Sequence, residues 1–235
     1  MALVLFDLDN TLVDRTDAFG RAVPSLAERY GLDPDMAVPF IIEADADGLR
    51  GWPTWMAATI EHFGIDTTVE EMRAAFRTVY LTGYTLEPAV ADGLRRLRVA
   101  GWRTGIVTNG PMSQVDKITG TGLDRLVDGW VVSEDIGVRK PDRRIFAEAA
   151  ARCGGSLDGG WMVGDSAPAD MAGARQAGLH SVWLRRGRAW GDVADTGQSE
   201  PDHQPDHQPD HQPDHQADSP VAAIDIVLGS GPGQR

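Results

Sequence analysis

Two carboxylates stand close together near the start of the chain, where they could hold a cation. The segment DLDNTLVD places Asp7 and Asp9 two residues apart, directly after an apolar run. Residues i and i+2 of an extended chain point to the same side, so both carboxylates can face one ligand. Close carboxylates repel each other unless a cation neutralises them. Because Mg2+ prefers one or two carboxylates with waters and phosphate oxygens, the pair indicates a Mg2+ site; capping of a turn is the alternative.

A second segment, TNGP, offers hydrogen-bond donors to an anion. Thr108 and Asn109 bring a hydroxyl and an amide to the expected start of a helix, which Pro111 can tolerate in its first turn. Unpaired N–H groups and the positive end of the helix dipole favour negative charge at such a terminus. We expect a phosphoryl group to bind there, with an ordinary capped turn as the alternative.

A third segment, KPD, contains Lys140, one of only two lysines beside twenty arginines. A lysine in so arginine-rich a chain suggests a site that needs a compact ammonium charge instead of a planar guanidinium. A chance surface lysine is the alternative. The other lysine is Lys117, to which the sequence alone gives no role.

A fourth segment, GDSAPAD, supplies Asp165 and Asp170. Asp165 leaves an apolar run as Asp7 does, and Asp170 falls within the helix that Pro168 begins. We expect this pair to complete the metal site and to provide a partner for a ligand or for Lys140. Acidic residues that complement a helix dipole are the alternative.

Short apolar runs alternate with helical patterns along most of the chain, which predicts an α/β fold with a mainly parallel, Rossmann-like sheet covered on both faces. The expected strands are residues 3–6, 105–107, 130–132, 161–163, 181–184 and 224–228. Ligands of such sheets bind at the carboxyl ends of the strands, where the segments DLDNTLVD, TNGP and GDSAPAD fall.

The strand pattern is missing from residues 15–85, which predicts a small all-helical domain inserted after the first strand. Thr67 and Glu70 fit a capping box that opens a helix over residues 68–80. Pro24 predicts a break or a late start in the first of these helices. We place the α/β core at residues 1–14 and 86–235.

Residues 192–220 carry four PDHQ repeats and eight acids, with no lysine or arginine. This composition predicts a disordered loop, because it offers no apolar face to offset the entropy of ordering. The repeated histidines suggest a metal-binding tract, but a proline in every repeat excludes the continuous helix that would align them.

The composition excludes several classes of protein. A net charge of −13 over 235 residues repels nucleic acid and anionic lipid. The single cysteine, Cys153, forms no internal disulfide, and neither a basic leader nor a membrane span is present, so we expect a cytoplasmic protein. The sequence does not indicate an oligomeric state.

Taken in order, DLDNTLVD, TNG, KPD and GDSAPAD resemble the motifs of the haloacid dehalogenase superfamily, subfamily I, whose helical cap follows the first strand. The resemblance implies a hydrolase of small-molecule phosphate monoesters that uses Mg2+ and an aspartyl-phosphate intermediate. The roles that it implies are a nucleophile at Asp7, a general acid and base at Asp9, phosphate binding by Thr108 and Lys140, and metal ligation by Asp165, with Asp170 near the metal or the lysine. Asn109 is the expected companion of Thr108 on the phosphate, and Asp7 and Asp9 would share the metal.

Three other activities are compatible with these residues. They are a phosphomutase or phosphotransferase that uses the same intermediate, a haloacid dehalogenase, and a non-catalytic scaffold. A dehalogenase is disfavoured because halide departs without a proton, and a scaffold is disfavoured because no motif carboxylate is missing. Within the cap, Arg50 is a candidate substrate contact, whereas Trp52 and Trp55 follow a helical stripe that indicates packing.

Overall fold

The computed structural model describes residues 1–48, 50–190 and 212–232. The chain forms two compact units, which we name the sheet unit, Met1–Val13 with Leu86–Arg235, and the helical unit, Asp14–Thr85. None of the helices within the described ranges has the length and apolar character needed to cross a bilayer.

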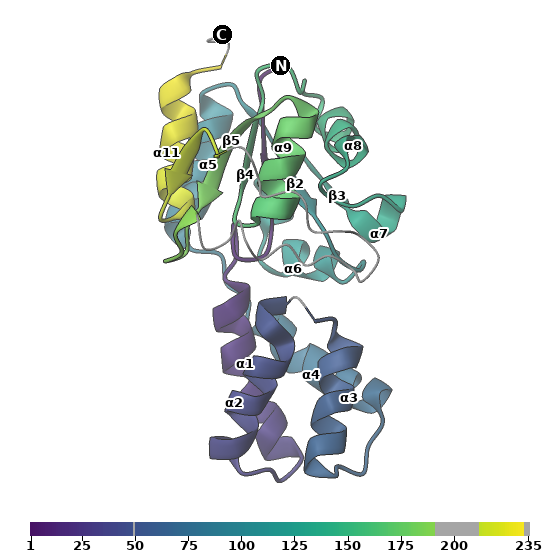
Figure 1. Cartoon of the computed structure of the whole chain (residues 1–235). Helices are drawn as coiled ribbons and strands as arrows, with labels where there is room; N and C mark the ends of the chain where they lie inside the picture. Colours follow the sequence, from purple (N-terminus) through teal and green to yellow (C-terminus); the bar gives the residue numbers. More distant parts are fainter. Residues whose placement is uncertain (49, 191–211, 233–235) are drawn as a thin grey trace. The chain divides into compact units, whose positions relative to one another are not determined.

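The sheet unit contains one six-stranded sheet in which every neighbouring pair of described strands is parallel (Figure 1). The strand order is β3-β2-β1-β4-β5-β6. Strands β2 and β3 are added on one side of β1, and β4, β5 and β6 are added on the other side, so the strand order changes direction between the neighbours β1 and β4. The strands are β1 Leu3–Phe6, β2 Arg103–Thr108, β3 Gly129–Val132, β4 Trp161–Gly164, β5 His180–Leu184 and β6 His215–Ala217. The predicted α/β class with a parallel Rossmann-like sheet is confirmed.

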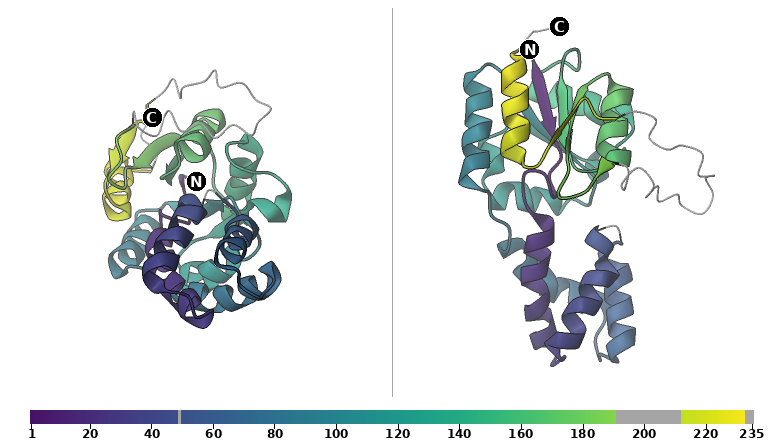
Figure 2. Two further views of the ribbon diagram at one scale, coloured as in Figure 1. Left: turned by 60° about the horizontal axis from the view of Figure 1, so that its bottom comes forward. Right: turned by 60° about the vertical axis from the view of Figure 1, so that its left-hand side comes forward.

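Helices cover both faces of this sheet, which explains why β1 and β4 are buried along their whole length. Helices α5 and α11 lie side by side on one face, and α8 and α9 lie on the other (Figures 1 and 2). The helices of the unit are α5 Pro88–Val99, α6 Gln114–Gly120, α7 Ser133–Ile136, α8 Arg143–Cys153, α9 Ala172–Ala177 and α11 Pro220–Ser230, with shorter turns η2 Leu123–Arg125 and η3 Ala167–Met171.

The last predicted strand, residues 224–228, is wrong, because this run lies within helix α11. Ser219 caps the helix by accepting the N–H of Ala222, and Pro220 occupies the first turn. Ile224 packs tightly on α5, where a Cβ added to Gly93 would lie 2.8 Å from its Cδ1. A mostly apolar run of five residues fits a strand or one side of a short helix equally well, and here the capped start at Ser219 favours the helix.

The end of the predicted disordered loop is also ordered. Residues 191–211, with His203, His207 and His211, lie outside the described residues, but His215 and Gln216 of the last PDHQ repeat belong to edge strand β6. The Asp214 carboxylate accepts the N–H and the hydroxyl of Ser181 on β5, at 2.8 and 3.0 Å. This acid therefore anchors the edge strand, which composition alone could not indicate.

Within its described residues, the helical unit has four helices and one short turn around an aromatic core. They are α1 Arg15–Arg29, α2 Pro34–Asp45, η1 Ala46–Gly48, α3 Trp52–Phe63 and α4 Val69–Thr82. Trp55, Phe76 and Tyr80 are among its fully buried side chains, and Trp52 contacts the last two edge-to-face at 5.2 and 5.1 Å. The tryptophans therefore pack the interior of this unit.

Two local predictions in the helical unit need correction. Helix α1 continues through Pro24, whose ring is exposed, so the Gly20 carbonyl that loses its helical donor can be solvated. The capping box lies one residue later than predicted: Thr68 and Glu71 exchange the two hydrogen bonds, at 3.2 and 3.0 Å. Adjacent threonines made the two positions indistinguishable in the sequence.

Candidate active site

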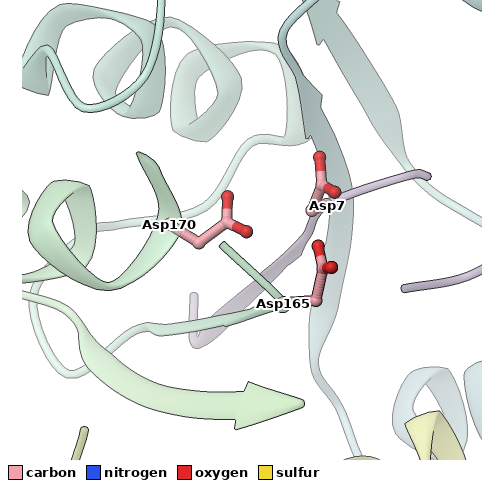
Figure 3. Close-up of side chains that lie close together, drawn as sticks. All are labelled: Asp7, Asp165 and Asp170. Carbon is pink, nitrogen blue, oxygen red and sulfur yellow. The ribbon is translucent and has the colours of Figure 1, made fainter. Parts of the chain in front are cut away.

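Three carboxylates from two segments meet at the carboxyl edge of the sheet (Figure 3). Strands β1 and β4 are parallel neighbours, and the Asp7 N–H donates to Val163 O at 2.9 Å. Asp7 and Asp165 therefore leave the sheet side by side, and Asp170 approaches them from η3. One oxygen from each of the three carboxylates lies within 4.8 Å of the others.

The turn after β4 folds Asp170 back onto the strand end. Ser166 donates its N–H to Asp170 Oδ2 at 3.0 Å, and its hydroxyl caps η3 by accepting from Ala169. Asp170 is fully buried, and a Cβ on Gly164 would lie only 2.2 Å from its Oδ2. The glycine of the GDSAPAD segment is therefore needed for this close approach.

Lys140 joins the cluster and neutralises part of it. Its Nζ lies 2.5 Å from Asp7 Oδ1 and 2.7 Å from Asp170 Oδ1, and the lysine side chain is only 2% exposed. Burial alone would lower the pKa of Lys140, but the carboxylates of Asp170 and Asp7 hold it above its ordinary value. The ammonium group is therefore a fixed positive charge between two acids.

Two of the three carboxylates resist ionisation, because they are buried beside other acids. Burial, together with the charges of Asp170 and Asp9, raises the pKa of Asp7 to about 7 despite Lys140. Burial and the same kind of repulsion raise the pKa of Asp165 to about 8, although Arg188 lies 3.2 Å from its Oδ2. Hard oxygen donors that resist ionisation at neutral pH fit a site for a hard divalent cation.

The TNG segment supports Lys140 from the end of β2. Asn109 donates its side-chain N–H to Lys140 O at 3.0 Å and accepts the Lys140 N–H at 2.8 Å. The buried Thr108 hydroxyl accepts from Gln114 Nε2 at 2.8 Å, which leaves its own proton available for a ligand. The Asn109 side chain therefore fixes the lysine, and a contact between Asn109 and phosphate stays a prediction.

The Asp9 carboxylate lies outside the group formed by Asp7, Asp165 and Asp170, and its predicted share in the metal stays a prediction. Its two oxygens instead lie 2.8 and 2.6 Å from Lys117 Nζ. Sequence reasoning missed Lys117, although its rarity is the same signal that marked Lys140. Both lysines of the chain thus contact motif aspartates.

Arg50, the predicted substrate contact, belongs to the helical unit. Its side chain is exposed, and its N–H donates to Asp45 O at 3.2 Å. Its role therefore stays a prediction, as does the role of the helical unit as a cap.

Comparison with known proteins identifies the family of this chain. Residues 1–178 match the haloacid dehalogenase-like hydrolase family. A structure described as a HAD phosphatase from Thermococcus onnurineus superposes with a TM-score of 0.62 at 25% identity, and the match covers 99% of this chain and 100% of that one. The chain belongs to the haloacid dehalogenase-like hydrolase family.

Its relatives in that family are named for more than one reaction. Phosphoserine phosphatase of Thermus thermophilus is 36% identical over 224 residues, 80% of this chain and 90% of that protein. Glyceraldehyde 3-phosphate phosphatase of Methanopyrus kandleri is 30% identical over 200 residues, 79% and 84% of the two chains. An (S)-2-haloacid dehalogenase of Pseudomonas fluorescens is also 30% identical, over 162 residues, 68% and 66% of the two chains.

Proposed function

We propose that this hydrolase cleaves small-molecule phosphate monoesters through an aspartyl-phosphate on Asp7. The observation that carries the proposal is the arrangement around Asp7, whose Oδ1 is held by Lys140 at 2.5 Å while Asp165 and Asp170 approach within the same cluster. A nucleophilic carboxylate beside a fixed ammonium and a cation site is suited to a dianionic ester.

The cation that fits this donor set is Mg2+, held by Asp7, Asp165 and Asp170. All three donors are hard carboxylate oxygens, and two of them have raised pKa values that a bound cation would counteract. Bound Mg2+ would offset the charge of the carboxylates and of the phosphoryl oxygens, so that the anionic nucleophile and the anionic ester can meet.

The chain's own residues perform the two displacements. Asp7 attacks phosphorus, and its new bond to phosphorus forms as the ester P–O bond breaks. The departing oxygen takes the electron pair and receives a proton from Asp9. Water then attacks the phosphorus of the aspartyl-phosphate while Asp9 takes its proton, which releases inorganic phosphate and restores Asp7.

Two further groups contact the phosphoryl oxygens in this proposal. Lys140 offers its remaining N–H to an oxygen, and Thr108 donates the hydroxyl proton that Gln114 leaves free. Asn109 keeps Lys140 in place through the two main-chain hydrogen bonds. These donors are preorganised before substrate binds, which is the condition for strong electrostatic stabilisation.

The test is a phosphate-release screen over sugar phosphates, phosphoserine, phosphoglycolate, nucleotides and p-nitrophenyl phosphate, with Mg2+ or with chelator. We expect Mg2+-dependent release that Asp7→Asn lowers by at least about a thousandfold, with the thermal transition retained. Phosphate release that is unchanged in Asp7→Asn overturns the mechanism. Chloride release from 2-chloropropionate without any phosphate release indicates the dehalogenase instead, and accumulation of a phosphorylated isomer indicates a mutase.

A further inference from the structure

Lys117 makes a buried ion pair that the proposed mechanism does not yet use. It lies on α6, and its Nζ contacts both oxygens of Asp9, at 2.8 and 2.6 Å. The lysine side chain is 7% exposed and that of Asp9 is 21% exposed. Burial removes the hydration of an ammonium group, and only an ion pair of good geometry compensates for this cost. Here the ammonium group contacts both oxygens of one carboxylate.

A second side chain of the same helix also binds the Asp9 carboxylate. Gln114, three residues before Lys117 and so on the same side of α6, donates from Nε2 to Asp9 Oδ2 at 2.9 Å. The same nitrogen donates to Thr108 Oγ1 at 2.8 Å. Gly110 permits this packing, since a Cβ there would lie 2.9 Å from Gln114 Cγ.

The arrangement holds the Asp9 carboxylate in one orientation. Asp9 follows the end of β1 and precedes Asn10, which has a left-handed backbone with φ of 60°. A carboxylate in such a turn has several staggered rotamers, but proton transfer needs one of them, within hydrogen-bond reach of the departing oxygen. Holding a catalytic group in one geometry before reaction removes an entropic cost from the barrier.

We propose that Lys117, assisted by Gln114, is a positioning residue that orients Asp9 for proton transfer to the leaving group. This inference rests on the proposed function, because it takes Asp9 as the proton donor. When Asp9 carries the proton, one carboxyl oxygen accepts from Lys117 Nζ and the other presents its hydrogen to the ester oxygen. The ester P–O bond then breaks, and the proton moves to the alkoxide as the Asp7–phosphorus bond forms.

The experiment compares two esters that differ in their need for a proton. The alkoxide that leaves an alkyl phosphate must be protonated as it departs, whereas 2,4-dinitrophenyl phosphate releases 2,4-dinitrophenolate, which is stable as an anion. The readout is kcat/KM, which reports the steps through formation of the aspartyl-phosphate and omits its later hydrolysis. We expect Lys117→Met to lower kcat/KM about a hundredfold for the alkyl ester and less than about threefold for the dinitrophenyl ester.

Three further variants give this comparison its controls. Lys117→Arg keeps a cation beside Asp9 and should recover most of the activity on the alkyl ester. Lys117→Gln keeps a neutral hydrogen-bond donor. It should also lower kcat/KM more for the alkyl ester than for the dinitrophenyl ester, but by a smaller factor than Lys117→Met. This variant tests the inference if Lys117→Met fails to fold. Arg152→Met removes a cation from an ion pair with Asp135 elsewhere in the sheet unit, at 2.9 Å, and should leave kcat/KM unchanged for both esters.

The outcomes separate the inference from the function on which it rests. If Lys117→Met and Lys117→Gln lower kcat/KM equally for both esters, and Lys117→Arg does not restore it, the ion pair has only a structural role. This result overturns the inference and leaves the proposed function standing. If the unaltered chain hydrolyses neither ester, the proposed function fails and the inference fails with it. A loss confined to the alkyl ester supports the inference, and Asp9→Asn should then show the same selectivity.

Discussion

Asn109 holds the main chain of Lys140 through both of its amide atoms, with Nδ2 donating to the carbonyl at 3.0 Å and Oδ1 accepting the N–H at 2.8 Å. The position of the ammonium beside Asp7 therefore depends on a neutral side chain 31 residues earlier in the sequence. This link joins the end of β2 to the segment before α8, and it makes Asn109 a target for mutation.

We expect Asn109→Ala to lower the free energy of unfolding by about 1–3 kcal/mol, because it leaves buried main-chain groups of Lys140 without partners. We also expect kcat to fall more than KM rises, since the ammonium loses its fixed place beside the nucleophile. Denaturant unfolding and steady-state kinetics measure the two effects. Asn109→Asp keeps the acceptor for the Lys140 N–H and loses the donor, so a stability above that of Asn109→Ala supports the account. Unchanged unfolding in Asn109→Ala contradicts it.

Gly164→Ala is expected to disturb the cation site without replacing any of the proposed ligands. The added Cβ would lie 2.2 Å from Asp170 Oδ2, so the carboxylate must turn away from Ser166 N–H and from Lys140. Loss of a group that only orients a metal ligand typically weakens metal affinity about 10–100-fold, so displacing the proposed ligand Asp170 should weaken Mg2+ affinity at least this much. Titration calorimetry with Mg2+ alone measures this affinity.

Gly20→Ala provides the matched control for that variant. A Cβ added to Gly20, within helix α1, meets nothing within 4 Å. The same glycine-to-alanine exchange should therefore leave Mg2+ affinity unchanged. Because alanine favours a helix more than glycine does, it should raise the free energy of unfolding by about 0.5–1 kcal/mol. Equal affinities in Gly164→Ala and Gly20→Ala exclude the proposed packing constraint.

The raised pKa values of Asp7 and Asp165, about 7 and about 8, predict how stability changes with pH. Between about pH 4 and pH 8 the folded chain without a cation retains protons on these two groups that the unfolded chain releases, so their contribution to stability falls as pH rises. A cation that binds the ionised carboxylates opposes this loss. The stabilisation by Mg2+ relative to chelator should therefore be small at pH 5 and larger at pH 8.

The measurement is the thermal midpoint with Mg2+ and with chelator at each pH, at constant ionic strength. Subtracting the two midpoints cancels the other groups that titrate over the same range. Where free Mg2+ exceeds its Kd a hundredfold, the expected gain is about 2.7 kcal/mol. Asp165→Asn should reduce this gain, and an equal gain at pH 5 and pH 8 is incompatible with carboxylates that must ionise to bind the cation.

The meeting of Asp7 with Asp165 was predictable, because both follow apolar runs that pair as parallel neighbours, β1 and β4. The contacts of the Asp9 carboxylate were not predictable from spacing. Its partner Lys117 lies 108 residues away, on a short helix whose rotation about its axis the sequence does not encode locally. The prediction of a strand at residues 224–228 failed for a different reason, since a short, mostly apolar run has no periodicity that separates strand from helix.

The buried ion pair of the helical unit offers a last prediction. Arg15 Nη2 lies 2.7 and 2.9 Å from the two oxygens of Asp45, which also accepts the N–H of Gly48 at 2.8 Å. Removing one partner leaves the other charge buried, which typically costs about 3–5 kcal/mol, whereas removing both leaves no uncompensated charge. We therefore expect Arg15→Met to destabilise the chain by this amount and Asp45→Leu by less, because Asp47 lies 4.0 Å from Arg15 Nη1. The double variant should be more stable than either single variant. Denaturant unfolding of the three variants forms a double-mutant cycle, and strictly additive losses would show that the pair does not act as a unit.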